Sequence, residues 1–100
     1  MRSPALREPS LASGDGAPLL SAFIFQIDAD QCPSLLCKVA GQVAQRGITA
    51  SELRMISSQR ECHVCLVIDE IEPHAASVLA EKFRAFIQVR SVKLEPVAIT

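Results

Sequence analysis

Apolar and polar residues alternate in several stretches of the chain and recur at helical spacing in others. Residues 22–28 (AFIFQID) alternate, with Phe23, Phe25 and Ile27 on one face. Successive side chains of a strand point to opposite faces, so this pattern predicts a strand whose one face is buried.

A helix is predicted to begin near Cys32. Pro33 suits the first turn of a helix, because its φ is already helical and its missing N–H had no partner there. Apolar residues then recur at i, i+3, i+4 and i+7, and Gly47 can adopt the left-handed conformation that ends a helix. One face of this helix should pack on a sheet through Leu36, Val39, Ala40 and Val43.

Two further strands are predicted to form a hairpin. Residues 48–58 are rich in β-branched and alternating residues, with Leu53 and Met55 facing one way. The polar residues 57–61 (SSQRE) form the hairpin loop. Residues 62–69 (CHVCLVID) carry apolar side chains on both faces, which indicates a central strand.

Pro73 opens a second predicted helix, which we expect to lie beside the first. Its apolar stripe consists of Ala76, Leu79, Ala80, Phe83 and Ile87. Residues 89–98 form the last strand, with Val92 and Leu94 inward. Pro96 has no N–H to donate, so this strand belongs at an edge.

The predicted order of elements is therefore β-α-β-β-α-β. Right-handed crossovers place both helices on one face of a four-stranded antiparallel sheet, with the first and third strands central. The fold class is α+β, a ferredoxin-like βαββαβ sandwich. The other face must be solvated or covered, and the apolar Ile24, Cys65 and Val67 on it predict partial cover, for which dimerisation is the simplest source.

Length and composition allow one domain. The chain has 100 residues, of which 49% are hydrophobic. Residues 1–20 contain Pro4, Pro9 and Pro18 and no apolar period, so burial cannot offset their ordering entropy. We therefore expect a disordered N-terminal tail over 1–20 and one folded domain over 21–100.

The charge balance limits the classes of partner that the protein is expected to bind. A net charge of −1 gives no summed field that would concentrate nucleic acid or an anionic membrane. No apolar run approaches the roughly 20 residues of a membrane helix, and the N-terminus has no hydrophobic segment typical of a secretory signal. A cytoplasmic protein with neutral molecules or proteins as partners is expected.

The four cysteines suggest packing rather than chemistry. Without an export signal, reduced thiols are favoured over disulfides. Cys32 and Cys37 are five residues apart, so on a helix their thiols diverge by about 140°. Cys62 and Cys65 lie at an odd offset on a strand and therefore face opposite ways. No metal site and no cofactor are expected.

Other proteins of this topology are disfavoured by single residues. An RNA-binding module stacks bases on aromatic side chains of the first and third strands, and the predicted third strand has none. An acylphosphatase would need an arginine in the loop after the first strand, whereas residues 28–34 (DADQCPS) are acidic. Neither His63 nor His74 has a carboxylate and a nucleophile nearby in sequence. No catalytic residue is predicted.

The turn, helix length and second turn together resemble the ACT family. Its usual pattern has a turn ending in Pro-Gly, an apolar helix and then Arg-Gly-Ile-Asn-Ile before the second strand. Here Pro33-Ser34 stands at the Pro-Gly position, and Gly47 follows thirteen residues after Ser34, within residues 45–49 (QRGIT). The resemblance covers residues 22–96. Within the family, the chain is most similar to the short regulatory subunits of acetohydroxyacid synthase (acetolactate synthase).

The resemblance implies a non-catalytic domain that dimerises and modulates a larger biosynthetic enzyme. In the family, amino-acid effectors bind between the loop after the first strand and the start of the second strand of a neighbouring subunit. The first group carried over is Asp30, Cys32, Pro33, Ser34 and Leu35. The second, across the interface, is Ile48, Thr49 and Ala50. A branched-chain amino acid is the expected effector, and acetohydroxyacid synthase the expected partner.

Three alternatives remain open at this stage. Ser34 replaces the family's glycine and Thr49 its asparagine, so effector binding could be altered or lost. The eight residues could then only cap a helix and shape a turn. An ACT-like dimer that recognises another protein without a small ligand is the second function, and a thiol or metal carrier is the third.

Overall fold

The computed structural model describes residues 19–97, which form six elements. The strands are β1 (Ser21–Asp30), β2 (Glu52–Ser57), β3 (Glu61–Ile71) and β4 (Val89–Pro96), and the helices are α1 (Leu35–Gln45) and α2 (Pro73–Arg84). The predicted order and fold class are confirmed. Of the predicted tail over 1–20, all but Leu19 and Leu20 lies outside the described residues.

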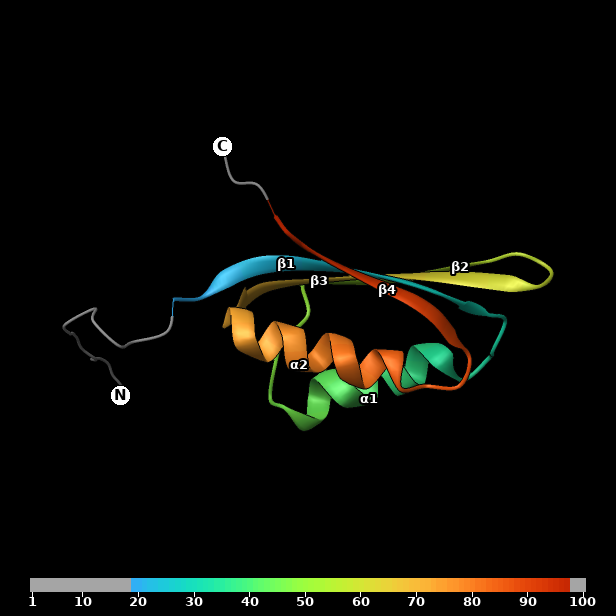
Figure 1. Cartoon of the computed structure of the whole chain (residues 1–100), viewed down its shortest axis with the longest axis horizontal. Coiled ribbons are helices and arrows are strands. Elements are labelled where there is room, and N and C mark those ends of the chain that lie inside the picture. The colour runs from blue at the N-terminus through green and yellow to red at the C-terminus, as the bar shows by residue number, and fades with distance from the viewer. Residues whose placement is uncertain (1–18, 98–100) are drawn as a thin grey trace.

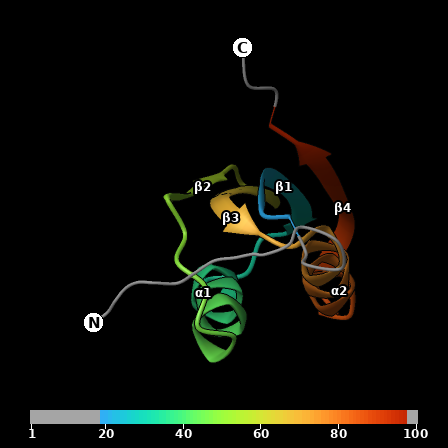
Figure 2. The same ribbon diagram turned by 90° about the vertical axis from the view of Figure 1, so that its left-hand side faces the viewer.

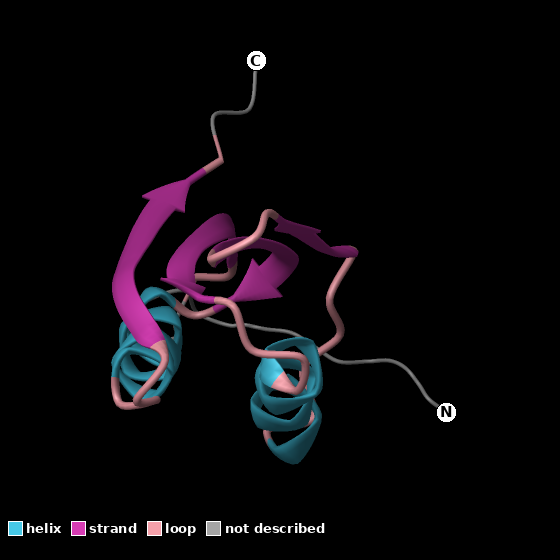
Figure 3. Cartoon of the chain, turned by 90° about the vertical axis from the view of Figure 1, so that its right-hand side faces the viewer, coloured by secondary structure: helices cyan, strands magenta, loops and turns pink. Residues whose placement is uncertain are grey.

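The four strands form one antiparallel sheet in the order β2-β3-β1-β4. β1 and β3 are central, as the sequence predicted, and β4 lies at an edge with Pro96 at its end (Figure 1). Both helices lie side by side under one face of the sheet (Figures 2 and 3). The other face, which we call the open face, carries no helix.

The core lies between the sheet and the two helices. Alternate residues of the central strands point into it, among them Phe25 and Ile27 of β1 and Leu66 of β3, all fully buried. The ring of Phe83 on α2 meets that of Phe25 edge to face, with 5.7 Å between centroids. No polar or charged side chain among residues 19–97 is fully buried. The buried side chains between the sheet and the helices are therefore all apolar.

The first helix begins three residues later than the sequence predicted. A turn precedes it, in which the N–H of Leu35 donates to the carbonyl of Cys32 at 3.1 Å. Ser34 is the N-cap residue, with φ −92° and ψ 0°. Pro33 thus shapes the turn before α1 instead of lying in its first turn.

The end of α1 has the predicted left-handed residue. Gly47 has a φ of +66°. The N–H of Gly47 donates to Ala44 O at 3.0 Å, and the N–H of Ile48 reaches back to Val43 O at 3.3 Å. These two bonds form a Schellman motif, which satisfies the last carbonyls of the helix and directs the chain toward the sheet.

Two further predicted boundaries were wrong, the end of α2 and the start of β2. α2 ends at Arg84, and Ile87 is 94% exposed in the turn before β4, so it does not belong to the buried stripe. The helix ends there because the chain must return to the sheet, and the N–H of Phe86 closes a tight turn onto Phe83 O. β2 likewise begins at Glu52 and not at Ile48, since residues 48–51 are still approaching the sheet.

Candidate functional site

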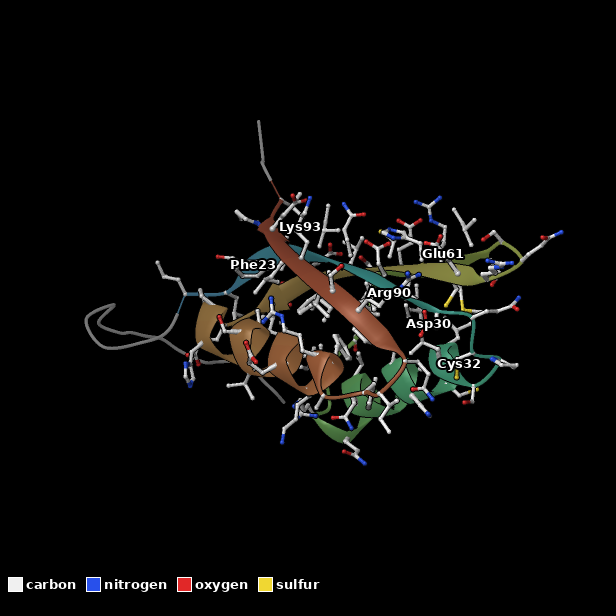
Figure 4. The ribbon with its side chains drawn as sticks, turned by 45° about the vertical axis from the view of Figure 1, so that its right-hand side comes forward. Phe23, Asp30, Cys32, Glu61, Arg90 and Lys93 are labelled. Carbon is white, nitrogen blue, oxygen red and sulfur yellow. The ribbon has the colours of Figure 1, made fainter. Side chains whose placement is uncertain are left out.

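The turn between β1 and α1 is fixed at its two sides by backbone hydrogen bonds. The N–H of Asp30 donates to Gln88 O and the N–H of Gln31 donates to Arg60 O, both at 2.9 Å. The carboxylate of Asp30 is 3.3 Å from Arg90 Nε, in an ion pair whose members both remain about half exposed or more (Figure 4). The position of the turn is therefore set by its neighbours on both sides.

Arg90 connects this turn to the hairpin between β2 and β3. Its Nη2 lies 3.1 Å from Glu61 Oε1 and donates to Ala29 O at 3.4 Å. Exposed ion pairs of this kind contribute about 1 kcal/mol or less each. The predicted site residue Asp30 thus already has a cationic partner.

Cys32 and Ser34 contact each other inside the turn. The Cys32 sulfur is buried and lies 3.3 Å from Ser34 Oγ. Hydrogen bonding to the Ser34 hydroxyl, and then to the Ser34 N–H, lowers the pKa of the Cys32 thiol below its usual value. Pro33 and Ser34 are exposed, whereas Leu35 is fully buried and belongs to the core.

The first turn of α1 presents unpaired backbone donors. Ser34 makes no side-chain capping bond, and no acidic residue lies in the first turn. Among residues 19–97, the N–H groups of Leu36 and Cys37 have no backbone acceptor. Free N–H groups and the positive end of the helix dipole favour an anion such as a carboxylate.

The second predicted group lies beyond the other end of α1. Thr49 is exposed, while Ile48 and Ala50 pack half-buried against the core. Gly47, Ile48 and Thr49 line a polar hollow of about 410 Å³ together with Ser51, Asp69 and Glu70. Within it, Ser51 Oγ donates to Val67 O at 3.2 Å and lies 3.3 Å from Asp69 Oδ1.

A second, more apolar hollow of about 480 Å³ adjoins the first and shares Ile48 and Glu70 with it. Apolar side chains of Leu20, Ile71 and Val78 form part of its lining. Arg46, Glu72 and His74 stand among its polar residues.

One chain does not bring the two predicted groups together. They lie at opposite ends of α1, whose 11 residues span about 16 Å (Figure 1). Ile48, Thr49 and Ala50 were expected to act from a neighbouring subunit. A joint site can therefore be built only by two copies of the chain.

Cys62 and Cys65 lie as their spacing predicted, whereas Cys32 lies in the turn before α1 and not on the helix with Cys37. Cys62 is buried on the core side of β3, whereas Cys65 is half-buried on the open face, so the two thiols point in opposite directions. Cys32 is buried and Cys37 exposed, and all four thiols are free. Within residues 19–97 no three His, Cys, Asp or Glu side chains gather as metal ligands would.

Sequence reasoning missed a polar cluster on the open face. His63 Nδ1 donates to Asp28 Oδ1 at 2.7 Å, and His63 Nε2 lies 2.9 Å from Gln26 Oε1. Ser91 Oγ donates to the other Asp28 oxygen at 3.4 Å. The hydroxyl thus contacts the carboxylate and not the imidazole, so His63 is not placed to take its proton. The strand register, which pairs Asp28 with His63 and Ser91, was the signal that could have revealed it.

Comparison with known proteins decides the family. A family model described as an ACT-like domain matches residues 19–100. The chain belongs to the ACT-like domain family. The matched range includes both turns and the whole of the sheet.

Solved structures with the same fold include an ACT domain. The ACT domain of a GTP pyrophosphokinase from Chlorobium tepidum superimposes with a TM-score of 0.67 at 12% identity, covering 76% of this chain and 99% of that one. An uncharacterised protein from Thermotoga maritima gives 0.65 at 15% identity, over 79% and 99%. A homoserine dehydrogenase from Thiobacillus denitrificans gives 0.65 at 15% identity, over 79% of this chain and 18% of that one.

These likenesses concern the fold, because the identities are low. No curated protein sequence matches the chain. ACT-like domains are in general regulatory or binding modules, and the ACT-like domain here has the corresponding architecture. No helix within residues 19–97 has the length and apolarity needed to span a membrane.

Proposed function

We propose that this ACT-like domain is a non-catalytic regulatory subunit that pairs with itself and modulates a larger amino-acid biosynthetic enzyme. The observation that carries the proposal is the start of α1, where the N–H groups of Leu36 and Cys37 have no backbone acceptor among residues 19–97. The similarity to a homoserine dehydrogenase, in which the matched part is 18% of the chain, is in keeping with a module that serves a biosynthetic enzyme.

The effector in this proposal is an amino acid whose carboxylate binds the N–H groups of Leu36 and Cys37. A carboxylate is favoured there because the helix dipole is positive and no acidic side chain competes. Ile48, Thr49 and Ala50 of a second copy would contribute the other wall. The free protein is thus expected to bind weakly until it dimerises.

For the enzyme, we propose acetohydroxyacid synthase, with valine, leucine or isoleucine as the effector. The support is the sequence resemblance to its short regulatory subunits, which consist of little more than one such domain. The effector and the synthase would then each change the affinity of the domain for the other. The coupling free energy between two such binding events is typically about 1–3 kcal/mol.

Calorimetric titration with valine, leucine and isoleucine, with and without a synthase catalytic subunit, tests this function. We expect heat from at least one amino acid and a change in synthase activity on adding the domain. No heat and no activity change in any combination would refute the proposal.

A second function is favoured by the contact between Cys32 and Ser34. With the Ser34 hydroxyl 3.3 Å from the sulfur, side chains occupy a turn where the family has glycine. The domain would then recognise another protein without a small ligand.

Ser34→Gly separates the two functions. If the serine obstructs a site that the fold still offers, the variant should gain amino-acid affinity of about tenfold, equal to roughly 1.4 kcal/mol. If the domain is only an interaction module, its amino-acid titrations and its affinity for the protein partner should both stay as in the wild type. Ser77→Gly, an exposed serine on α2, is the matched control.

A further inference from the structure

Beside the Asp28–His63 cluster, the open face carries two adjacent rows of residues that run across all four strands and have charged residues at their edges. Strand register aligns Glu52, Val67, Ile24 and Glu95 in one row, which we call the acidic row. The register aligns a second row two residues away on each strand. This basic row consists of Arg54, Cys65, Gln26 and Lys93. Each row thus has charges of one sign at its two edges and uncharged side chains between them.

The middle of these rows is only partly covered. Ile24, Val67 and Cys65 are half-buried although no helix lies over them. Lys93 projects from the same face, away from the helices (Figure 4). Lys93 and Glu95 have no ion-pair partner within residues 19–97, whereas Glu52 and Arg54 pair within their own strand at 2.7 Å.

This pattern is complementary to itself in one orientation. Consider a second copy laid face to face, related by a two-fold axis that crosses the strands between the two rows. The acidic row of each copy then lies over the basic row of the other. At the β4 edge, Glu95 of one copy faces Lys93 of the other, and at the β2 edge, Glu52 of one copy faces Arg54 of the other. Packed sheets are about 10 Å apart, a gap that a Lys and a Glu side chain span together.

The same axis places apolar groups opposite one another in the centre. Val67 of one copy lies over Cys65 of the other, and Ile24 lies over the aliphatic part of Gln26. A two-fold axis parallel to the strands gives the opposite result, because it sets Glu52 over Glu95 and Arg54 over Lys93. Like charges facing each other disfavour that arrangement.

We propose that a second copy of this chain covers the open face in this crossed-row arrangement. The inference specifies the surface used by the pairing that the proposed function assumes. It also brings the β1–α1 turn of one copy to the same end of the dimer as the start of β2 in the other. Because the contact is isologous, every substitution acts twice in the interface.

Charge reversal at one edge tests the arrangement. Sedimentation velocity of the full chain, reduced and at several concentrations, should show a monomer–dimer equilibrium. Lys93→Glu creates two repulsive Glu–Glu contacts and should weaken dimerisation about tenfold or more. The double variant Lys93→Glu with Glu95→Lys exchanges the two charges and should restore the wild-type equilibrium. Lys82→Glu, on the exposed side of α2, is the matched control and should change nothing.

Each other result would overturn the inference. A chain that stays monomeric at every concentration has no such interface. Stronger dimerisation of Lys93→Glu would indicate an axis parallel to the strands, and an unchanged equilibrium would place the dimer contact elsewhere. The proposed function can fail separately. Dimers that respond to the charge reversals as expected but bind no amino acid would leave the inference about the open face standing. Valine binding to a chain that remains monomeric would refute the inference about the open face.

Discussion

Each strand of the sheet presents alternate residues to two different environments. On the side closed by α1 and α2, the side chains are apolar and those of the central strands are almost completely buried. On the open face, the same strands carry Glu52, Arg54, Asp28, His63 and Lys93. One backbone thus supports a surface selected for packing and a surface that retains specific polar contacts.

The comparison shows where stability and recognition reside in this fold. A closed side whose buried side chains are all apolar derives its energy from area and packing, and many apolar sequences could replace it. The open face adds little energy to the single chain, since its ion pairs are exposed. Some of its charges, however, lie in the acidic row and the basic row, and in the proposed dimer this order is what the second copy recognises.

Truncating Phe83 should have the largest effect of any change considered. The ring is fully buried and meets Phe25 edge to face, so Phe83→Ala removes packing on the closed side and leaves a cavity. We expect a loss of about 3–5 kcal/mol in the free energy of unfolding, measured by urea denaturation. This is a large part of the stability of a small domain.

Ile87→Ala is the control for that variant. Ile87 is 94% exposed, so its truncation should change the unfolding free energy by less than about 0.5 kcal/mol. A large loss on truncating Ile87 would mean that the helical stripe continues beyond Arg84, as the sequence pattern suggested.

Two glycines on the helix side should respond with opposite signs. Gly47 has a φ of +66°, where a Cβ is strained even though no atom lies within 4 Å of its position. Gly47→Ala should therefore destabilise the domain by about 1–2 kcal/mol. Gly41 lies exposed inside α1 with free space around it, so Gly41→Ala should stabilise by about 0.5–1 kcal/mol. Thermal unfolding of the two variants checks the pair, and shifts of the same sign would contradict the assigned backbone conformations.

The closed side was predictable from the sequence to a large extent. Alternation from Phe23 to Ile27 and the spacing of Val39 and Val43 fix which residues meet in the core. Gly47 was predictable because few other residues adopt its φ. The exceptions were boundaries: Ile87 continues the helical period, but the connection to β4 determines where the helix ends.

The contacts in the candidate site and on the open face were less predictable from the sequence. The positions of Pro33 and Thr49 follow from family resemblance, but the contact of Cys32 with Ser34 depends on a turn whose dihedral angles no pattern specifies. The contact between Asp28 and His63 joins residues 35 apart, so it appears only once the strand register is known.

The smallest expected effect is the pH dependence of that contact on the open face. The hydrogen bond from His63 lowers the pKa of the Asp28 carboxyl, with a further contribution from Ser91. The unfolded chain therefore binds this proton more readily than the folded one. The resulting stabilisation is present above the unfolded pKa of about 3.9 and is lost as pH falls through the lower folded pKa.

Asp28→Asn measures this contribution directly. Since the Asp28 side chain is 59% exposed, we expect the variant to be less stable by under about 1 kcal/mol near neutral pH, and the difference to shrink below about pH 4. Urea unfolding from pH 3 to 7 gives the curve, and the same substitution in a His63→Ala background should show a smaller difference. A difference that is independent of pH, or unchanged without the imidazole, would show that Asp28 acts on the open face through something other than its bond to His63.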